Sequence, residues 1–556
     1  MNKIDLPDNV RREFEAIVGA RFVTTDPAML AGHIWCVNIA KVHGAEKFPP
    51  NWPIAAVLPS STEEVAAVVK CCVRHGLKYR PHSTGYGSGG QTGTTKSVVI
   101  DLRRMNTLEI DPKNRMAILG PYVTAGMLQA EALKHGMTCH IVGAGPAHSP
   151  LASATSMVGV GITSQGTSMN VRNLLAWEWV TPEGDIVRGG AAGAGCGWFS
   201  GEGPGPGTRG LLRGLFGGQG ALGVFTKIGY KLYPVPVKGP LEETGRRPQL
   251  GARIPENAGF FQVVWPDWES HRAASFELVD ENVCFAMLRM PPDHIGWTLT
   301  ASNAEYVKQV RESSLGEPAR QDATKNWTLL TLSHSPAEHA WRTGVVKEIV
   351  QRTGGRILDL PIEEAEVLHR NLFTSIYVPR ALRPAGGMGT SFGVMDSLHF
   401  LPNVMESGEE HLAGKNGVDG PLITGGKEEH WAWPQEGRYF WSENIIQYDP
   451  RVKAARVTAI QALLEHFPIV WKNHAGLGVC ALGPLMELQG DSIGAPQDYI
   501  RAVKHYYDPK NSSWSPDFIP FTIPKLLQKV LPVLRPVLTS KPVIKFIARG
   551  MGDKGM

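Results

Sequence analysis

The sequence lacks the features of several specialised protein classes. Residues 1–7 contain no apolar run, so we expect no secretory signal and a cytoplasmic location. The net charge of +4 is small for 556 residues and indicates no nucleic-acid partner. Seven cysteines show no metal-ligand spacing, and their odd number argues against a disulfide framework. They stand at positions 36, 71, 72, 139, 196, 284 and 480.

The composition that remains is that of an ordinary globular enzyme. Hydrophobic residues make up 42% of the chain and charged residues 19%, and 556 residues allow two or more domains with ample core. Cys71 and Cys72 stand in a helical pattern, so we expect them to serve packing rather than redox chemistry.

A glycine-rich loop, residues 80–90, follows an amphipathic helix predicted over 61–76 and precedes a strand predicted over 97–102. Four glycines within residues 85–90 let the backbone approach a ligand and turn its N–H groups inward, which suits a pyrophosphate. The spacing is neither that of a P-loop nor that of the dinucleotide fingerprint. A plain turn can have the same composition, so the loop alone does not define a function.

The segments that follow give the loop its context. They are a strand over 115–120, a helix over 124–135, a small-residue segment over 153–163, a strand–turn–strand over 174–188, and the stretch 216–227. In this order they resemble the flavin domain of the vanillyl-alcohol oxidase and p-cresol methylhydroxylase (PCMH) family, nearest to its 4-alkylphenol oxidoreductase branch. The resemblance covers about residues 50–236 and a shorter C-terminal piece.

The resemblance implies an α+β fold, in which a PCMH-type FAD-binding domain carries a cap domain built on an antiparallel sheet flanked by helices. It divides the chain into a helical lead-in (1–50), the FAD-binding domain (51–236), the cap (237–470), a return to the FAD-binding domain (471–518) and a tail (519–556). The residues it implies for FAD binding are Pro81, His82, Ser83, Thr84, Gly85, Tyr86, Gly87, Ser88, Thr155, Ser156, Gly159, Gly161, Ile162, Thr163, Gly223 and Val224.

The resemblance also points to residues around the substrate. Tyr86 matches a phenolate-binding tyrosine of the family. An adjacent Tyr-Arg pair on a C-terminal strand is replaced here by Trp471 and Lys472, with His474 nearby. Lysine supplies charge but not the planar fork of arginine, so a phenol oxygen and a carboxylate fit Lys472 about equally.

Two further histidines are candidates. Ser397 stands where many members attach FAD through histidine, and His399, expected on the same face of a strand, is a possible substitute. We nevertheless expect non-covalent FAD, because no other anchor is matched. His148 stands close to the position of a family aspartate near the flavin and could act as a base with an ordinary pKa.

Three functions remain open on this basis. The first is hydride transfer from a para-substituted phenol or a related aromatic alcohol to FAD, with oxygen, a cytochrome or a quinone as electron acceptor. The second is oxidation of a 2-hydroxy acid, as in D-lactate and glycolate dehydrogenases, which often use a metal held by histidines; His399 and His474 are the candidates. The third is a non-catalytic flavin-fold subunit.

The tail has no counterpart in the family. Residues 520–552 carry six basic residues and no acidic one, interspersed with apolar residues. This pattern suits peripheral contact with an anionic membrane, although Pro532, Pro536 and Pro542 interrupt it and no apolar run could span a bilayer. The alternative is an arm packed on a neighbouring subunit of a homo-oligomer.

Overall fold

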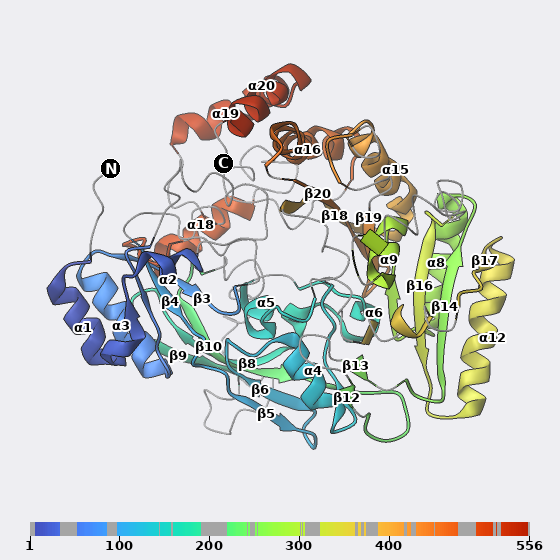
Figure 1. The fold of residues 1–556 in the computed structure, drawn as a ribbon, viewed down its shortest axis with the longest axis horizontal. Coiled ribbons are helices and arrows are strands. Elements are labelled where there is room, and N and C mark those ends of the chain that lie inside the picture. Colours follow the sequence, from blue (N-terminus) through green and yellow to red (C-terminus); the bar gives the residue numbers. More distant parts are fainter. Residues whose placement is uncertain are drawn as a thin grey trace.

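The computed structural model describes most of the chain. The described residues are 6–33, 53–85, 97–143, 145–156, 159–190, 220–241, 243–244, 251–252, 254–300, 302, 304–305, 323–361, 365–368, 372–373, 387–415, 420–423, 430–449, 451–475, 496–514, 519 and 524–553. Tyr86, Gly87 and Ser88 lie outside them. Figure 1 shows an N-terminal domain in blue to green beside a cap in yellow to orange, with the C-terminal helices in red.

The N-terminal domain contains two sheets. The first has the order β1-β2-β4-β3, in which β2 and β3 both run parallel to β4. Its strands are β1 (Val23–Thr24), β2 (Ala55–Val57), β3 (Lys78–His82) and β4 (Ser97–Asp101). The second has the order β5-β6-β10-β8-β9, entirely antiparallel. Its strands are β5 (Leu108–Asp111), β6 (Met116–Leu119), β8 (Leu174–Val180), β9 (Ile186–Gly189) and β10 (Val224–Lys231).

Helix α3 (Thr62–Arg74) shows how the sequence builds the first layer. Ser61 caps it, because its Oγ accepts a hydrogen bond from the Glu64 N–H at 3.2 Å. Its apolar face packs with α1 (Asp8–Val18) and the first sheet, and Cys71 and Cys72 are fully buried in that core. Burial raises the pKa of Cys71 to about 11, so the expectation of a packing role is confirmed.

The remaining short elements of the N-terminal domain are η1 (Ala20–Phe22), α2 (Pro27–Ala31), α4 (Ala125–Leu133), α5 (Pro150–Ser156), α6 (Ser164–Thr167), η2 (Asn170–Asn173), β7 (Met137–Thr138) and β11 (Tyr233–Pro234).

The cap is built on antiparallel strands, as predicted. One sheet has the order β15-β16-β14-β17 and the other β18-β20-β19. Backbone hydrogen bonds between Arg289 and Ala432, at 2.7 and 3.0 Å, join β15 to β19 and make one continuous surface. The strands are β14 (Ala258–Val264), β15 (Ala286–Leu288), β16 (Asn326–Leu332), β17 (Arg356–Ile357), β18 (Gly387–Ser397), β19 (His430–Gln435) and β20 (Tyr439–Tyr448); β12 (Glu243–Thr244) and β13 (Gly251–Ala252) form a separate pair.

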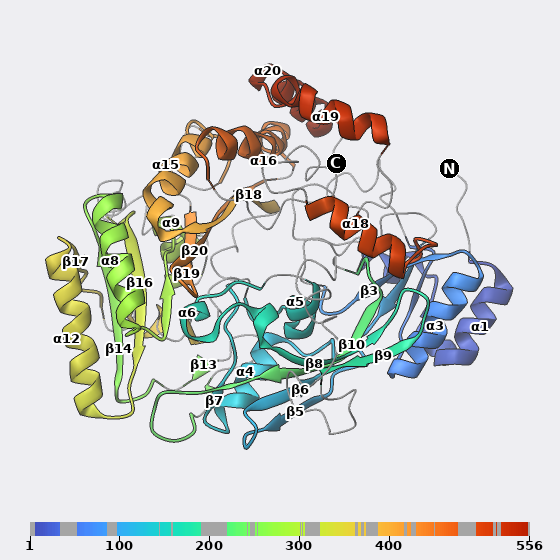
Figure 2. The same cartoon turned by 180° about the vertical axis from the view of Figure 1, so that it is seen from behind.

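Helices cover the outer side of this surface, away from the N-terminal domain (Figure 2). They are α8 (Trp268–Glu281), α12 (Pro336–Arg352), α15 (Leu401–Leu412) and α16 (Lys453–Lys472), whereas α9 (Pro292–Leu299) contacts the other face of the sheet, where its His294 bonds Trp431. Val394, Ala432 and Phe440 of the sheet pack with these helices in one hydrophobic cluster. Because strand side chains alternate, the residues between them face the N-terminal domain.

The chain then returns to the N-terminal domain. After α18 (Pro496–Tyr507), the Tyr79 N–H donates to Ser512 O and the Trp514 N–H donates to Tyr79 O, both at 2.9 Å. Residues 512–514 therefore extend the edge of β3. The chain ends in α19 (Lys525–Leu538) and α20 (Lys541–Asp553). None of the helices in the described ranges is long and apolar enough to cross a membrane.

Candidate functional site

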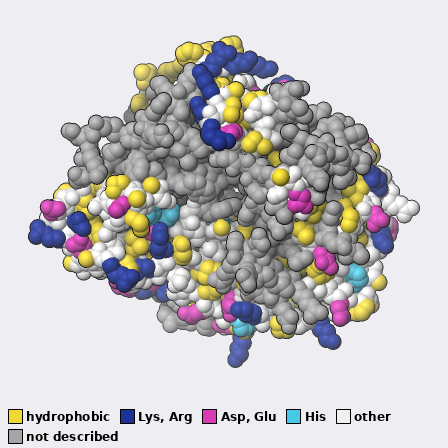
Figure 3. Space-filling model, in the orientation of Figure 1, with side chains coloured by type: hydrophobic (Ala, Val, Ile, Leu, Met, Phe, Trp, Pro, Cys, Tyr) yellow, Lys and Arg dark blue, Asp and Glu magenta, His cyan; other side chains and the backbone are white. Residues whose placement is uncertain are grey.

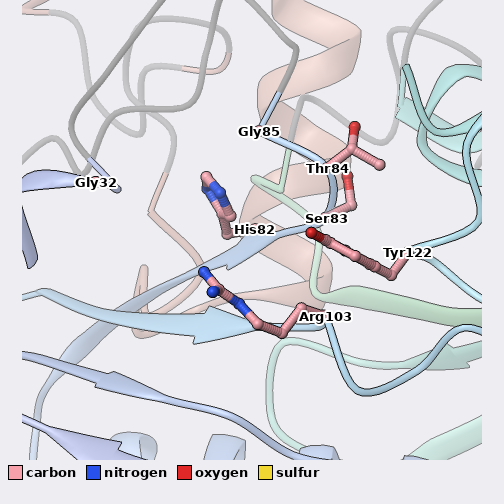
Figure 4. A pocket seen from close by; sticks show the side chains of 7 residues that line it. All are labelled: Gly32, His82, Ser83, Thr84, Gly85, Arg103 and Tyr122. Carbon is pink, nitrogen blue, oxygen red and sulfur yellow. The ribbon is translucent and has the colours of Figure 1, made fainter. Parts of the chain in front are cut away.

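The glycine-rich loop begins where β3 ends and borders a hollow of about 240 Å³, shown in Figure 4. Its lining residues are Gly32, His82, Ser83, Thr84, Gly85, Arg103 and Tyr122. Gly85 has φ +72°, and a Cβ built on it would lie 2.8 Å from His82 Nε2, so the turn requires glycine. The first half of the predicted FAD loop thus lines a polar hollow, together with a cation that sequence reasoning did not assign.

That cation, Arg103, is held by a buried carboxylate. Asp101 Oδ2 accepts from Arg103 Nε at 2.8 Å and bonds His33 Nε2 at 2.7 Å, while Asp101 Oδ1 accepts from the Arg103 N–H at 3.0 Å. Burial by itself would raise the pKa of Asp101, but the bonds from His33 and Arg103 outweigh it and lower the pKa to about 2. Arg103 is therefore oriented by a permanent anion while its side chain stays 46% exposed beside the hollow.

His82 supplies no second cation there. Its ring lies 5.1 Å from that of His33, edge to face, and burial lowers its pKa to about 4. His82 is consequently neutral at physiological pH. Backbone N–H groups, hydroxyls and one oriented guanidinium are donors that suit a pyrophosphate, so the residues present fit FAD.

In the second segment predicted to bind FAD, the backbone at Gly159 and Gly161 passes very close to other parts of the chain. A Cβ on Gly159, which has φ +64°, would lie 2.3 Å from Asn170 Cβ and 2.4 Å from Ser153 Oγ; one on Gly161 would lie 2.1 Å from Ile141 O. The predicted ligands Thr155 and Thr163 use their hydroxyls within the protein, since Thr155 donates to Leu151 O and Thr163 accepts from the Ile141 N–H, both at 2.9 Å. Roles for these two hydroxyls and for Ser156 in FAD binding stay predictions.

Gly223 and Val224 lie where the C-terminal segment docks. Gly223 has φ +79° and its N–H donates to Ser513 Oγ at 2.9 Å, and Val224 begins β10 as a fully buried residue. The Gly223 N–H is therefore already engaged within the protein. Any contact of Gly223 and Val224 with FAD stays a prediction.

The inner face of the cap sheet meets the segment around residues 141–162. Trp433 and Trp441 are cross-strand partners on β19 and β20, and Trp431 lies on the same face of β19. All three belong to one hydrophobic cluster with Ile141 and Ile162. The approach is close, because a Cβ on Gly143 would lie 2.6 Å from Trp433 Cη2.

The three indole N–H groups on this face differ in their hydrogen bonding. Trp431 Nε1 donates to His294 Nδ1. Trp433 Nε1 and Trp441 Nε1 are buried and have no hydrogen-bond partner among the residues that the structure describes. A buried donor without a partner costs about 1–3 kcal/mol, so both groups are suited to meeting an acceptor from outside the chain.

His148 belongs to the segment around residues 141–162, but it is not a base with an ordinary pKa. It is buried, its Nδ1 bonds Gly145 O, and burial lowers its pKa to about 4. That part of the prediction was wrong. The bond to a carbonyl places the proton on Nδ1 and leaves Nε2 as an acceptor.

The other predicted catalytic residues are not brought to the inner face of the cap sheet. Trp471 and Lys472, expected in the place of a pair on a C-terminal strand, lie instead on a helix, because α16 runs through Pro468 to Lys472. Lys472 is 65% exposed and bonds Glu410 at 3.1 Å, while Trp471 lies under the Arg535 guanidinium at 4.2 Å. His474, with φ +51°, is an exposed residue just beyond the helix end.

His399 is not on a strand either. β18 ends at Ser397, and His399 lies in the 3-10 helix η5 (Leu398–Phe400), exposed, with its ring 4.8 Å from that of Phe276. Ser397 ends the strand by accepting the His399 N–H at 3.3 Å. Neither His399 nor His474 belongs to a group of three or more potential metal ligands within the described ranges. The one metal-like group within the described ranges is Glu13, Cys71 and His75, on α1 and α3 with the turn that follows α3.

We expect Gly159→Ala to weaken FAD binding. The left-handed backbone and the contacts with Asn170 and Ser153 together cost about 2–4 kcal/mol, which must be relieved by moving the segment. The ratio of flavin to protein absorbance after gel filtration measures the loss. Gly166→Ala is the matched control, since a Cβ there meets nothing within 4 Å. Equal flavin content in the two variants would contradict a role for this segment.

Comparison with known proteins agrees with this geometry. Residues 53–190 match the family described as FAD binding domain. An uncharacterised FAD-linked oxidoreductase of Mycobacterium tuberculosis is 27% identical over 472 residues, covering 83% of this chain and 90% of that protein. A D-lactate dehydrogenase of Archaeoglobus fulgidus is 33% identical over 221 residues, covering 36% of this chain and only 46% of that protein. The crystal structure of p-cresol methylhydroxylase with substrate bound superposes with a TM-score of 0.67 at 18% identity, covering 91% of this chain and 95% of the other.

The chain therefore has the PCMH-type FAD-binding fold, and it is an FAD-dependent oxidoreductase. The predicted fold class and cofactor are confirmed. The placement in the 4-alkylphenol branch stays a prediction.

Proposed function

We propose that this oxidoreductase acts on a para-substituted phenol or a related aromatic alcohol that binds at the inner face of the cap sheet beside Trp433 and Trp441. The observation that carries the proposal is the inner face of the cap, where Trp433 and Trp441 combine flat apolar surface with two buried indole N–H groups that lack a partner within the described ranges. Bound FAD would supply the hydride acceptor. The likeness to p-cresol methylhydroxylase with its substrate supports the same class of substrate.

Each residue has a defined task in this proposal. The Trp433 and Trp441 rings pack along the substrate ring and exclude water, and their N–H groups donate to the substrate oxygen as negative charge develops there. His148 Nε2 accepts a hydrogen bond from the substrate hydroxyl, because Nδ1 is committed to Gly145 O. Tyr86, outside the described residues, remains the second proposed oxygen ligand.

A 2-hydroxy acid is the second candidate, favoured by the match to the archaeal D-lactate dehydrogenase. Such a substrate needs a cation for its carboxylate. Arg289 is fully buried in the cap, but its guanidinium donates to Thr324 O at 2.8 Å and lies 5.6 Å over the Trp268 ring, on the helix side of the sheet. Within the described ranges, Arg289 is therefore engaged on the helix side and is not placed to bind a carboxylate at the inner face of the sheet. Non-covalent FAD, the electron acceptor and a homo-oligomeric state stay predictions.

The test is anaerobic mixing of the purified holoenzyme with 4-alkylphenols, aromatic alcohols, D-lactate and glycolate while flavin absorbance is followed. We expect bleaching by the aromatic compounds, and about a 10–100-fold lower kcat/KM for Trp433→Phe or Trp441→Phe, since each loses a hydrogen bond to a charged oxygen. Trp341→Phe is the control, because Trp341 is 54% exposed on α12. Bleaching by D-lactate or glycolate alone, with both buried variants unchanged, would refute the aromatic proposal.

A further inference from the structure

The two C-terminal helices are fixed to the cap by one side only. On α20, Ile544 and Ala548, four residues apart, are buried, and Ala548 belongs to a hydrophobic cluster with Ala455 and Ala459 of α16. On α19, the Arg535 guanidinium lies 4.2 Å over the Trp471 ring at the end of α16. α19 continues through Pro532 and Pro536, and the break between the two helices falls at Thr539 and Ser540. The α19–α20 pair is therefore a defined surface of the cap and not a loose extension.

The side of α19 and α20 that faces away from the cap exposes large apolar side chains. Leu526, Val533 and Val537 of α19 are 74%, 76% and 57% exposed, and their spacing of seven and four residues places them on one helical stripe. On α20, Phe546 is 79% exposed. Water is an unfavourable environment for so many large apolar groups on two adjacent helices, which marks an interaction surface.

The charge around this apolar stripe has one sign. Lys541, Lys545 and Arg549 follow one another at four-residue intervals on α20 and are all exposed, and Lys529 is exposed on α19. Residues 520–552 contain no acidic residue. Figure 3 shows hydrophobic and basic side chains together along the upper edge of the molecule, where α19 and α20 lie in Figure 1.

We propose that the α19–α20 pair docks the enzyme on an anionic lipid surface. The exposed apolar side chains enter the boundary between head groups and acyl chains, and the lysines and arginine bind the lipid phosphates and carboxylates. A second copy of the chain is a poorer partner for this surface. A symmetric dimer would bring each basic stripe against its own copy, and like charges at short range repel.

Vesicle sedimentation with the full-length holoenzyme tests the proposal. We expect binding to vesicles of phosphatidylcholine with about one third phosphatidylserine, little binding to phosphatidylcholine alone, and release as salt rises from about 0.1 M to about 0.5 M. Neutralising the stripe as Lys541→Gln, Lys545→Gln and Arg549→Gln should weaken the partition coefficient about 100-fold. Phe546→Ser should weaken it about tenfold.

Matched controls separate this surface from general charge and hydrophobicity. Lys113→Gln, Lys134→Gln and Lys347→Gln remove the same charge from exposed positions elsewhere, and Met29→Ser removes a side chain that is 57% exposed. Both controls should bind like the unaltered enzyme, and flavin content should be unchanged throughout. Binding to neutral and anionic vesicles alike, or to neither, would overturn the proposal. So would sedimentation equilibrium that shows an oligomer dissociated by Phe546→Ser, since the face would then be a subunit interface.

Discussion

Asp508→Ala is expected to lower the free energy of unfolding by about 3–5 kcal/mol and to release FAD at lower denaturant than in the unaltered enzyme. Asp508 and Lys504 form an ion pair whose side chains are 1% and 0% exposed. The carboxylate also accepts the Ser512 and Ser513 N–H groups at 2.7 and 2.9 Å, and the ammonium donates to Ala221 O at 2.7 Å. Removing the aspartate leaves a buried cation and two amides without their acceptor, which is the cause of the large loss.

The measurement is urea unfolding followed by tryptophan and flavin fluorescence. Asp498→Ala is the matched control, because Asp498 stands on the same helix and its ion pair with Arg501 leaves its side chain 71% exposed. Although the Arg501 side chain is only 9% exposed, the Asp498 carboxylate lies largely in solvent, so the pair is screened and contributes about 0–1 kcal/mol, and this variant should unfold almost normally. Similar unfolding midpoints for the two variants would show that the C-terminal segment does not stabilise the N-terminal domain.

The second large effect is a steep loss of stability below pH 6.5. Seven histidines are buried within the described ranges, and burial lowers the pKa of five of them, that of His148 to about 4 and those of His140, His271, His294 and His466 to about 3. Each of these five is neutral in the folded protein and takes up a proton near pH 6.5 when unfolded. The unfolded state thus binds more protons below pH 6.5, so this stability is fully present above pH 6.5 and is lost as the pH falls toward the folded pKa values.

At pH 5 each of these histidines costs about 2 kcal/mol, and five together approach the whole stability of a typical protein, about 5–15 kcal/mol. Unfolding free energies from pH 8 to pH 5 measure the slope. His271→Gln should reduce the slope even where it lowers stability at pH 8, and His135→Gln, at a position 39% exposed, should leave it unchanged. A stability that does not vary between pH 8 and pH 5 would contradict the buried, neutral state.

The sequence predicted best those elements whose signals are local. Ser61 and the apolar pattern after it predicted a helix over 61–76, and α3 occupies Thr62–Arg74. The strand predicted over 97–102 is β4, at Ser97–Asp101. Each of these elements is determined by a cap or an apolar run within a few residues, which a single chain displays directly.

Two helices that contain proline were not expected to be continuous. Trp471 and Lys472 were expected in the place of a pair on a strand, yet α16 continues through Pro468 to Lys472, and α19 continues through Pro532 and Pro536, which were expected to interrupt the tail. A proline costs one backbone hydrogen bond and some crowding, and burial of residues such as Phe467 and Val470 can offset that cost. Local propensity does not contain this tertiary contribution.

From the sequence, only the part of the site that lies within one continuous segment could be predicted. The glycines of residues 85–90 predicted the loop. Arg103 and Asp101 lie beside it because β4 runs parallel to β3, so that the ends of both strands meet at one edge of the sheet. That signal was present in the sequence, since Asp101 and Arg103 end the neighbouring predicted strand. The Trp433 and Trp441 face could not be derived in the same way, because it depends on the register of β19 with β20 and on how the cap closes.

The strand extension by residues 512–514 has a consequence for the order in which the protein is made. Gly223 and Ser513 are bonded partners 290 residues apart, and Lys504 and Asp508 complete the same contact. A ribosome adding roughly 5–20 residues per second needs about 15–60 s to pass from one to the other. During that time the N-terminal domain emerges with one sheet edge unpaired, and it can close only after the whole cap has been synthesised. Completion of this sheet edge therefore has to wait until residues 512–514 have been synthesised.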